Sequence, residues 1–195
     1  MKRLLPFLLA LSASLTWGQT GHERRYELRL DPNWPLKIEL GSGDYQIVAS
    51  TSDSIAVMYD DGNTEAARKV EVQIGSGHGQ NHVKIVGPKS NFRAVIEVPR
   101  KTDLRVRMSA GGLSIGDVEG NKDIEVLAGN LELNSLRPQD YAQADFSVRI
   151  GDVYAPLFST AKSGLGRSFK TSGPGKYRLH AHVGMGDMTL RKSKI

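Results

Sequence analysis

Two histidines, His180 and His182, are the side chains whose type and spacing come nearest to a metal site. Residues two apart on a β-strand point to the same face, so both imidazoles could bind one zinc ion if a neighbouring strand supplied a third ligand. Leu179, Ala181 and Val183 alternate with them and take the inward positions. The chain has no cysteine, and no acidic partner is evident nearby. We therefore expect two exposed histidines, and their metal binding stays open.

Two glycine-rich stretches are similar to catalytic loops but lack an essential feature. Gly173-Pro174-Gly175-Lys176 lacks the spacing of a phosphate-binding loop, and it is followed by Tyr177 where serine or threonine is required. The stretch from Gly75 to Asn81 holds a serine without the glycine spacing of a nucleophile elbow. We expect it to be an exposed, polar loop. Neither stretch predicts nucleotide binding or nucleophilic catalysis.

Four aspartates that each follow a glycine are candidates for calcium ligands. They are Asp44, Asp117, Asp152 and Asp187. Calcium-binding rolls need a nonapeptide glycine–aspartate rhythm, which is absent, and an aspartate that tolerates left-handed backbone at a corner explains the pattern. Asp60 and Asp61 point to opposite sides of an extended chain, so they do not form a catalytic pair. The sequence thus predicts no catalytic, cofactor-binding or metal-binding residue.

The elements that must position these side chains are five copies of one pattern. Each copy alternates apolar and other residues, reaches a glycine followed by Asp, Asn or Gly, and then alternates again. The copies are Ile38–Ile47, Val106–Ile115, Ile124–Leu133, Phe146–Ala155 and Ala181–Leu190. Alternation at period two is typical of strands buried on one face, and the glycine pair breaks each strand because it reaches positive φ at low cost. The chain is predicted to be a β-repeat protein.

The spacing of the corner glycines favours a small single-stranded β-solenoid. Gly111, Gly129, Gly151 and Gly186 are 18, 22 and 35 residues apart, and about 20 residues make one coil. The long interval predicts one coil plus an exposed loop insertion at about 156–176. An antiparallel meander is the alternative, because Gly-Asn and Gly-Asp also form hairpin turns. Residues 50–100 predict flanking antiparallel hairpins, and residues 101–195 predict the solenoid coils.

Stacking of consecutive coils makes a prediction about charged neighbours. Aligning Gly111 with Gly129 places Arg105 beside Asp123 and Arg107 beside Glu125, all four pointing outward. Pairs of opposite charge across neighbouring strands favour this register, and a meander gives no reason for them to meet.

The N-terminus and the composition bear on location and partners. Residues 1–18 combine Lys2 and Arg3 with an apolar run and a small-residue end, as in a signal peptide cleaved after Gly18. Residues 19–195 are then expected to be one β-repeat domain with no membrane-spanning segment. Their net charge of +3, against +5 for the whole chain, is interspersed with acids and does not favour nucleic acid as a partner. No disulfide can form, so pairing and packing must supply the stability.

The sequence resembles the bacterial putative-adhesin family of unknown function, whose fold is the toast-rack type of β-solenoid. The segments that carry the resemblance are Ile38–Asp44, Ala94–Pro99, Leu104–Val106, Gly112–Ile115, Gly116–Val118 and Gly129–Leu133. It spans roughly Leu36 to Leu190. The resemblance implies an exported, mostly-β protein of the cell envelope, and it supplies no catalytic residue.

These observations lead to one main functional hypothesis and two alternatives. The main hypothesis is a non-enzymatic periplasmic or secreted protein that presents a β-surface for adhesion or assembly, with an envelope protein or a glycan as its partner. One alternative is an envelope sensing or regulatory module that binds a protein. The other is a carbohydrate-active β-helix enzyme, against which stand the modest length and the few aromatics, with Trp34 alone among the tryptophans after residue 18. No cofactor is expected, and the sequence does not determine the oligomeric state.

Overall fold

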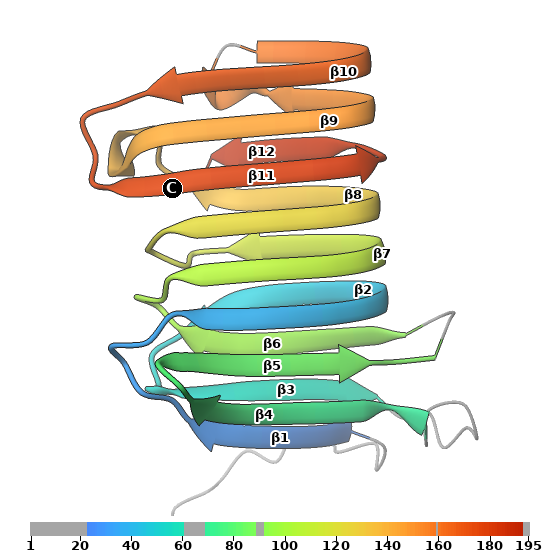
Figure 1. Cartoon of the computed structure of the whole chain (residues 1–195), viewed down its shortest axis with the longest axis vertical. Coiled ribbons are helices and arrows are strands. Elements are labelled where there is room, and N and C mark those ends of the chain that lie inside the picture. The colour runs from blue at the N-terminus through green and yellow to red at the C-terminus, as the bar shows by residue number, and fades with distance from the viewer. Residues whose placement is uncertain (1–22, 61–68, 89–91, 159, 193–195) are drawn as a thin grey trace, which may run out of the picture.

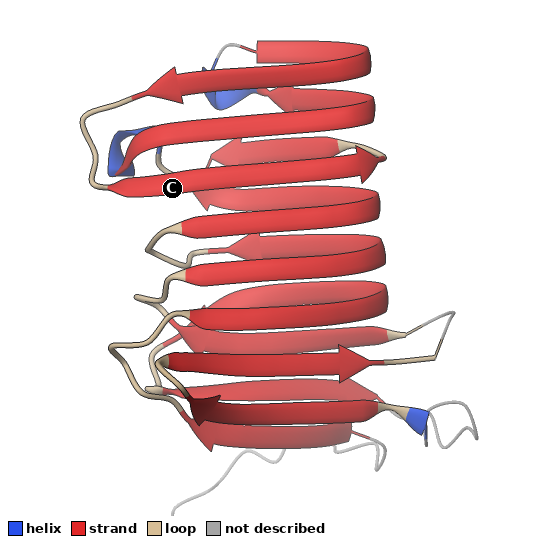
Figure 2. Cartoon of the chain, viewed as in Figure 1, coloured by secondary structure: helices blue, strands red, loops and turns tan. Residues whose placement is uncertain are grey.

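The computed structural model describes residues 23–60, 69–88, 92–158 and 160–192, and for residues 160–163 it describes the backbone only. Within these ranges the chain is all-β, as predicted, and its twelve strands belong to one sheet (Figures 1 and 2). Two short 3-10 helices, η2 (Pro138–Asp140) and η3 (Pro156–Phe158), flank β9. No helix in the described ranges is long and apolar enough to cross a membrane. The predicted signal peptide, residues 1–18, lies outside them.

The strands differ in length. Four of the longer strands each contain one repeat copy, and the fifth copy is divided between the last two strands. In chain order the strands are β1 (Glu23–Arg29), β2 (Leu36–Ser50), β3 (Ser54–Asp60), β4 (Glu71–Gly77), β5 (Gln80–Val86), β6 (Arg93–Pro99), β7 (Leu104–Gly116), β8 (Lys122–Leu136), β9 (Tyr141–Ala155), β10 (Thr160–Ser172), β11 (Tyr177–Met185) and β12 (Met188–Lys192).

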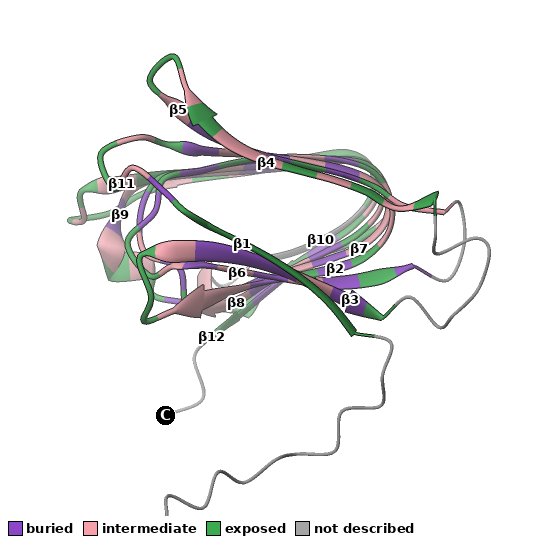
Figure 3. Cartoon of the chain, turned by 90° about the horizontal axis from the view of Figure 1, so that it is seen from below, coloured by how far each residue is buried: buried purple, intermediate pink, exposed green. Residues whose placement is uncertain are grey.

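Each long strand bends at its corner glycine and passes from one layer to the other. Seen along the stack, the two layers lie face to face, joined on the bend side, with buried residues between them (Figure 3). We call the layer that holds β5, β11 and the pre-bend halves of β2, β7, β8 and β9 the first layer. The second layer holds β6, β12 and the post-bend halves. In β8, Ile124, Val126, Leu131 and Leu133 are at most 1% exposed, so both halves of the strand contribute to one core.

Neighbouring copies stack in parallel with their corners aligned. Gly111 of β7 lies opposite Gly129 of β8, and Gly43 of β2 lies opposite Gly111. The predicted pairs are confirmed, because Arg105 is the register partner of Asp123 and Arg107 that of Glu125. A meander is excluded for these strands, since a meander would pair them antiparallel.

The predicted consecutive order of the coils is wrong for the last copy. β11 pairs in parallel with both β8 and β9, and β12 does the same, so the last copy lies between two copies that precede it in the chain. Met185, for example, lies opposite both Ala128 and Ile150. All copies present the same alternation and the same backbone edges, so the repeat pattern alone does not specify which copies become neighbours.

The predicted loop insertion at 156–176 is also wrong over most of its length. Residues 160–172 form β10, which pairs antiparallel with β9 along its whole length. Gly164 lies opposite the corner Gly151, and Phe169 stacks on Phe146 with ring centroids 6.3 Å apart. β10 is the last strand of the stack, so one of its hydrogen-bonding edges has no partner strand among the described residues (Figure 1). This position explains its glycine-rich, polar composition, which is also typical of loops.

The predicted hairpins at 50–100 are confirmed only in part. β4 pairs antiparallel with β5, and β3 pairs antiparallel with β6 and β1. However, β5 and β6 pair in parallel with the two halves of β2, so together they form a further copy that is interrupted at the bend. The expected loop at 75–81 is mostly strand, and its turn consists of His78 and Gly79 between β4 and β5.

Candidate binding surface

The corner glycines fix the geometry on which both outer faces depend. Gly129 has φ 134°, a region that favours glycine, as predicted. A Cβ atom placed on Gly129 would lie 1.9 Å from the carbonyl oxygen of Gly111. The neighbouring backbones approach so closely that an alanine would clash, which makes glycine necessary for two independent reasons.

At three corners, the Asp or Asn that follows the glycine bonds to the neighbouring copy. The side chain accepts a hydrogen bond from the backbone N–H at the same position of the next strand. The bonds are Gly112 to Asp44 at 3.1 Å, Asp187 to Asn130 at 3.2 Å and Asp152 to Asp187 at 2.9 Å. Left-handed backbone, the expected role of the aspartates, occurs among the four only at Asp117, with φ 57°. The glycine supplies the corner conformation, and the Asp or Asn connects the copies.

A charged ladder crosses the outer face of the first layer. Arg107 bridges Asp123 at 2.8 Å and Glu125 at 3.0 Å, while Arg105 reaches Asp123 at 3.2 Å. Partial burial would raise the pKa of Asp123, but the hydrogen bond from Arg107 and the charges of Arg107, Arg105 and His180 together lower it. The carboxylate is thus held ionised between guanidinium groups. Exposed pairs of this kind contribute little to stability each, about 0.2–1 kcal/mol, and help to define the register.

The two histidines lie within this ladder and have acidic neighbours that the sequence did not reveal. His180 is the register partner of Asp123 and Asp145, and His182 is that of Glu125 and Ser147. Nδ1 of His182 lies 2.8 Å from the Ser147 hydroxyl. In the described ranges, no three His, Asp or Glu residues lie in an arrangement that could hold a metal ion. Both side chains are half-buried and face outward.

The outer face of the second layer carries an open groove of about 810 Å³. β7 forms its floor because Gly112 and Ser114 are the smallest outward residues in the series, between Asp44 and Gln46 on β2 and Asn130 and Glu132 on β8. Four carboxylates and one guanidinium line it. They are Glu23, Asp44, Asp60, Glu132 and Arg93. We call this hollow the acidic groove. Asp61, the neighbour of Asp60, lies outside the described residues.

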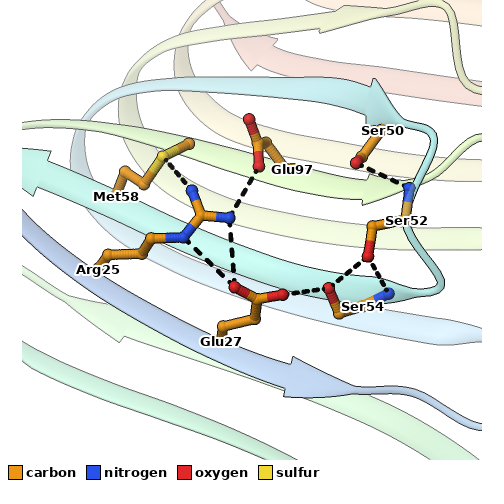
Figure 4. Close-up of polar contacts among 7 residues, drawn as sticks. All are labelled: Arg25, Glu27, Ser50, Ser52, Ser54, Met58 and Glu97. Atoms are coloured by element: carbon orange, nitrogen blue, oxygen red, sulfur yellow. Dashed lines mark hydrogen bonds and ion pairs between the residues drawn. The ribbon is translucent and has the colours of Figure 1, made fainter. Parts of the chain in front are cut away.

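A polar cluster on β1, β3 and β6 lies beside the acidic groove and contacts one of its lining residues, Met58 (Figure 4). Arg25 contacts Glu27 and Glu97, each at 3.3 Å, and its Nη1 lies 2.9 Å from the sulfur of the groove residue Met58. Ser54 donates to Glu27 at 2.6 Å. These hydrogen bonds, Ser54 first and then Arg25, lower the pKa of Glu27. The cluster ties the edge strand β1 to the sheet beside the groove.

The sequence reasoning missed a buried lysine. Lys122 is 4% exposed and occupies the inward position that Leu104 and Leu179 hold in the adjacent strands. Its Nζ donates to the Tyr141 hydroxyl at 2.8 Å and to the Gly120 carbonyl at 3.2 Å. Burial lowers the pKa of Lys122 to about 8, against the opposing pull of nearby carboxylates. The available signal in the sequence was a lysine at a position where the equivalent residues of two other copies, Leu104 and Leu179, are leucines.

The other glycine-rich candidate, Gly173–Lys176, is a turn in which two backbone amides are already bonded. Between β10 and β11, Gly173 donates its N–H to Ala142 and Lys176 donates its N–H to Asp140, both at 3.1 Å. These donors point at carbonyl groups of the same chain. Two of the three backbone N–H groups in this stretch are therefore not available to a phosphate group, and Pro174 has no N–H.

The fold is similar to that of known structures, although the sequence matches no family model and no curated protein. A protein from Clostridium sporogenes, described as a "putative cell adhesion protein", aligns with a TM-score of 0.51 and 14% identity, over 88% of this chain and 100% of that one. A "putative adhesin" from Parabacteroides distasonis aligns over 88% of this chain and 71% of that one, at 10% identity and a TM-score of 0.28. The first comparison shows a shared all-β fold.

Proposed function

We propose that this chain is an exported, non-enzymatic protein of the cell envelope that binds a partner in adhesion or assembly. The acidic groove is the observation that carries the proposal. It is an open hollow on a face whose strands are fixed by corner glycines and inter-copy hydrogen bonds. The name of the Clostridium sporogenes protein and the resemblance to the putative-adhesin family support the adhesion role. We further assign the stack to the toast-rack type of β-solenoid, which the aligned corners of β2, β7 and β8 support.

The charge of the groove indicates the kind of partner. Four carboxylates line the groove with one guanidinium, Arg93, which lies 3.8 Å from Asp44. A second guanidinium, Arg191, reaches Glu132 at 4.0 Å from outside the lining, so carboxylates remain in excess. The excess of negative charge favours a partner segment rich in lysine or arginine and disfavours phosphate-rich ligands. Such an interaction weakens as salt screens it, with a Debye length of about 8 Å at physiological ionic strength.

The proposal is tested by binding of purified residues 19–195 to envelope fractions of the producing cell. We expect saturable binding that a double variant, Asp44→Asn with Glu132→Gln, weakens about tenfold at low salt. Asn at position 44 keeps the acceptor that Gly112 needs, because Asn130 performs the same role. The matched control, Glu125→Gln with Asp145→Asn, removes two charges from the other outer face and should bind normally.

Two results would contradict the proposal. Absence of saturable binding to every envelope fraction contradicts adhesion, and equal weakening by the control contradicts the groove as the site. Export is tested separately by sequencing the N-terminus of the protein recovered from the envelope. We expect it to begin at Gln19, whereas recovery of the intact chain from the cytoplasm alone would exclude export.

A further inference from the structure

A second hollow, distinct from the acidic groove, is lined by residues of the turns that connect the strands. These turns lie on the side of the stack opposite the glycine bends (Figure 2). The volume of the hollow is about 720 Å³, within the range of ligand pockets. One wall is the turn before β2, which contains Trp34. The opposite wall consists of the loops that follow β2, β6 and β7, with Tyr177 of β11 beside them. We call it the Trp34 cleft.

We propose that the Trp34 cleft binds a neutral oligosaccharide, with the indole of Trp34 as a stacking platform. The inference rests on the proposed function, because it names a glycan as one ligand of the same envelope protein.

A buried asparagine holds the tryptophan turn in place. Asn81 is 1% exposed, and its Nδ2 donates to the carbonyl groups of Asp31 at 2.9 Å and Trp34 at 3.0 Å. Its Oδ1 accepts from the N–H of Asp31 at 3.2 Å, and its own N–H donates to Pro35 at 3.0 Å. Prolines at positions 32 and 35 restrict the turn further. The turn is ordered before any ligand arrives, so little entropy is lost when the half-buried indole contacts one.

The opposite wall is ordered in the same way. The Thr102 hydroxyl donates to the Pro99 carbonyl at 2.6 Å. The N–H of Thr102 donates to the Glu119 carbonyl at 2.9 Å, and the N–H of Glu119 donates to the Arg100 carbonyl at 2.7 Å. Asp103 accepts two hydrogen bonds from Asn121, at 2.7 and 2.9 Å. Asp53 and Lys101, which also line the cleft, have no ion-pair partner among the described residues. They offer an acceptor and a donor to a ligand on a rigid frame.

The chemistry of the lining favours a sugar over other ligand classes. Four carboxylates, of Asp31, Asp53, Asp103 and Glu119, outnumber two cationic groups, which disfavours nucleic acid and other polyanions. The cleft has one aliphatic lining residue, the buried Leu30, beside proline and aromatic rings, whereas a lipid chain needs a long, continuous apolar channel. An aromatic face beside mixed donors and acceptors matches a pyranose ring, which has C–H groups on its faces and hydroxyl groups around its edge.

The position of Trp34 makes the test direct. It is the single tryptophan of residues 19–195, so the fluorescence of the mature protein reports on this cleft. We would titrate the protein with chitotetraose, cellotetraose, mannotetraose and xylotetraose. The expected result is a saturable change of tryptophan emission with at least one of them, at a Kd of roughly millimolar or tighter. No saturable change with any of the four overturns the proposal.

Variants measured by calorimetry separate the cleft from the rest of the surface. Trp34→Ala should lower the affinity about tenfold or more, and Trp34→Phe, which keeps an aromatic face, should lower it less. Lys101→Ala should lower it about threefold to tenfold by removing one hydrogen bond to the ligand. The lysine side chain is exposed and has no ion pair with the described residues, so its removal should not disturb the fold. Tyr154→Ala, which removes a tyrosine 55% exposed outside the cleft, is the matched control and should bind normally. An equal loss in the control, or tighter binding of a heparin fragment than of any neutral sugar, overturns the assignment.

Failure of the glycan site can be distinguished from failure of the adhesion proposal. If the cleft variants bind envelope fractions as the wild type does while the tetrasaccharides fail to bind, the glycan site is refuted and the adhesion proposal stands. If the sugars bind but no envelope fraction does, the adhesion proposal fails and the cleft is retained.

Discussion

The side chain of Asn130 accepts a hydrogen bond from the backbone N–H of Asp187 at 3.2 Å, although 57 residues separate them. Asp187 in turn accepts from the N–H of Asp152 at 2.9 Å. These two bonds place the last copy between two earlier ones, so the stack does not follow the order of the chain. Because of this order, β11 and β12 must pair between β8 and β9. Their placement depends on contacts between residues far apart in sequence.

Engineered cysteines test the order of the copies. In consecutive stacking Asp123 and Asp145 would be neighbours, whereas in the structure His180 is the register partner of both. The pairs Asp123→Cys/His180→Cys and His180→Cys/Asp145→Cys should therefore form disulfides readily. Asp123→Cys/Asp145→Cys should not, because two strand spacings of about 4.8 Å exceed the roughly 7 Å limit between Cα atoms.

The chain contains no native cysteine, so each pair can be measured alone. Arg107→Cys/Glu125→Cys is the positive control, since both orders make these residues neighbours. Efficient cross-linking of positions 123 and 145 would contradict the observed order.

The corner at Gly129 is predicted to tolerate no side chain. Gly129→Val should lower the free energy of unfolding by about 3 kcal/mol or more, because positive φ and a contact with the Gly111 carbonyl both oppose a Cβ atom. Gly116→Ala is the matched control: its Cβ would meet no atom closer than 3.9 Å. Chemical denaturation of the two variants measures the difference, and equal stability would show that the corner accepts other residues.

Zinc is expected to leave the stability of the protein unchanged. His180 and His182 have acidic register partners, yet no group of three possible ligands in the described ranges is arranged around a common point. Adding zinc should therefore shift the Tm of the wild type no more than that of the His180→Ala/His182→Ala variant. A shift confined to the wild type would establish a metal site on the charged ladder.

Buried Lys122 predicts a stability that rises with pH. Burial lowers its pKa from 10.5 to about 8, so between these values the unfolded chain holds a proton that the folded chain has released. Stability increases with pH wherever the unfolded state binds more protons, by up to about 2 kcal/mol from pH 8 to pH 10 for this group. The buried Tyr141 has a raised pKa and acts in the opposite direction above pH 10.

Denaturation of the wild type and of Lys122→Met across pH 8 to 10 checks this. The variant keeps a long side chain at the position but cannot titrate, so its stability should rise less with pH. Identical pH profiles for the two proteins would mean that Lys122 keeps its ordinary pKa.

Several features could be predicted from the sequence because they depend on neighbouring residues. Alternation in each copy determines which side chains point inward, and this prediction holds in both halves of β8. The corner at Gly129 follows from the conformational freedom of glycine. The pairing of Arg105 with Asp123 followed from aligning two copies that are consecutive in the chain and also adjacent in the stack.

Other features were decided only by the tertiary structure. All copies offer similar edges and apolar rows, so the place of β11 between β8 and β9 is decided by pairing between strands far apart in sequence. Residues 160–172 became a strand because β9 offered a free edge, despite a composition typical of loops. The Trp34 cleft depends on Asn81, which lies 47 residues away in sequence and reaches the turn only in the folded chain. Local sequence encodes the faces of each strand, whereas the choice of neighbours is a property of the whole chain.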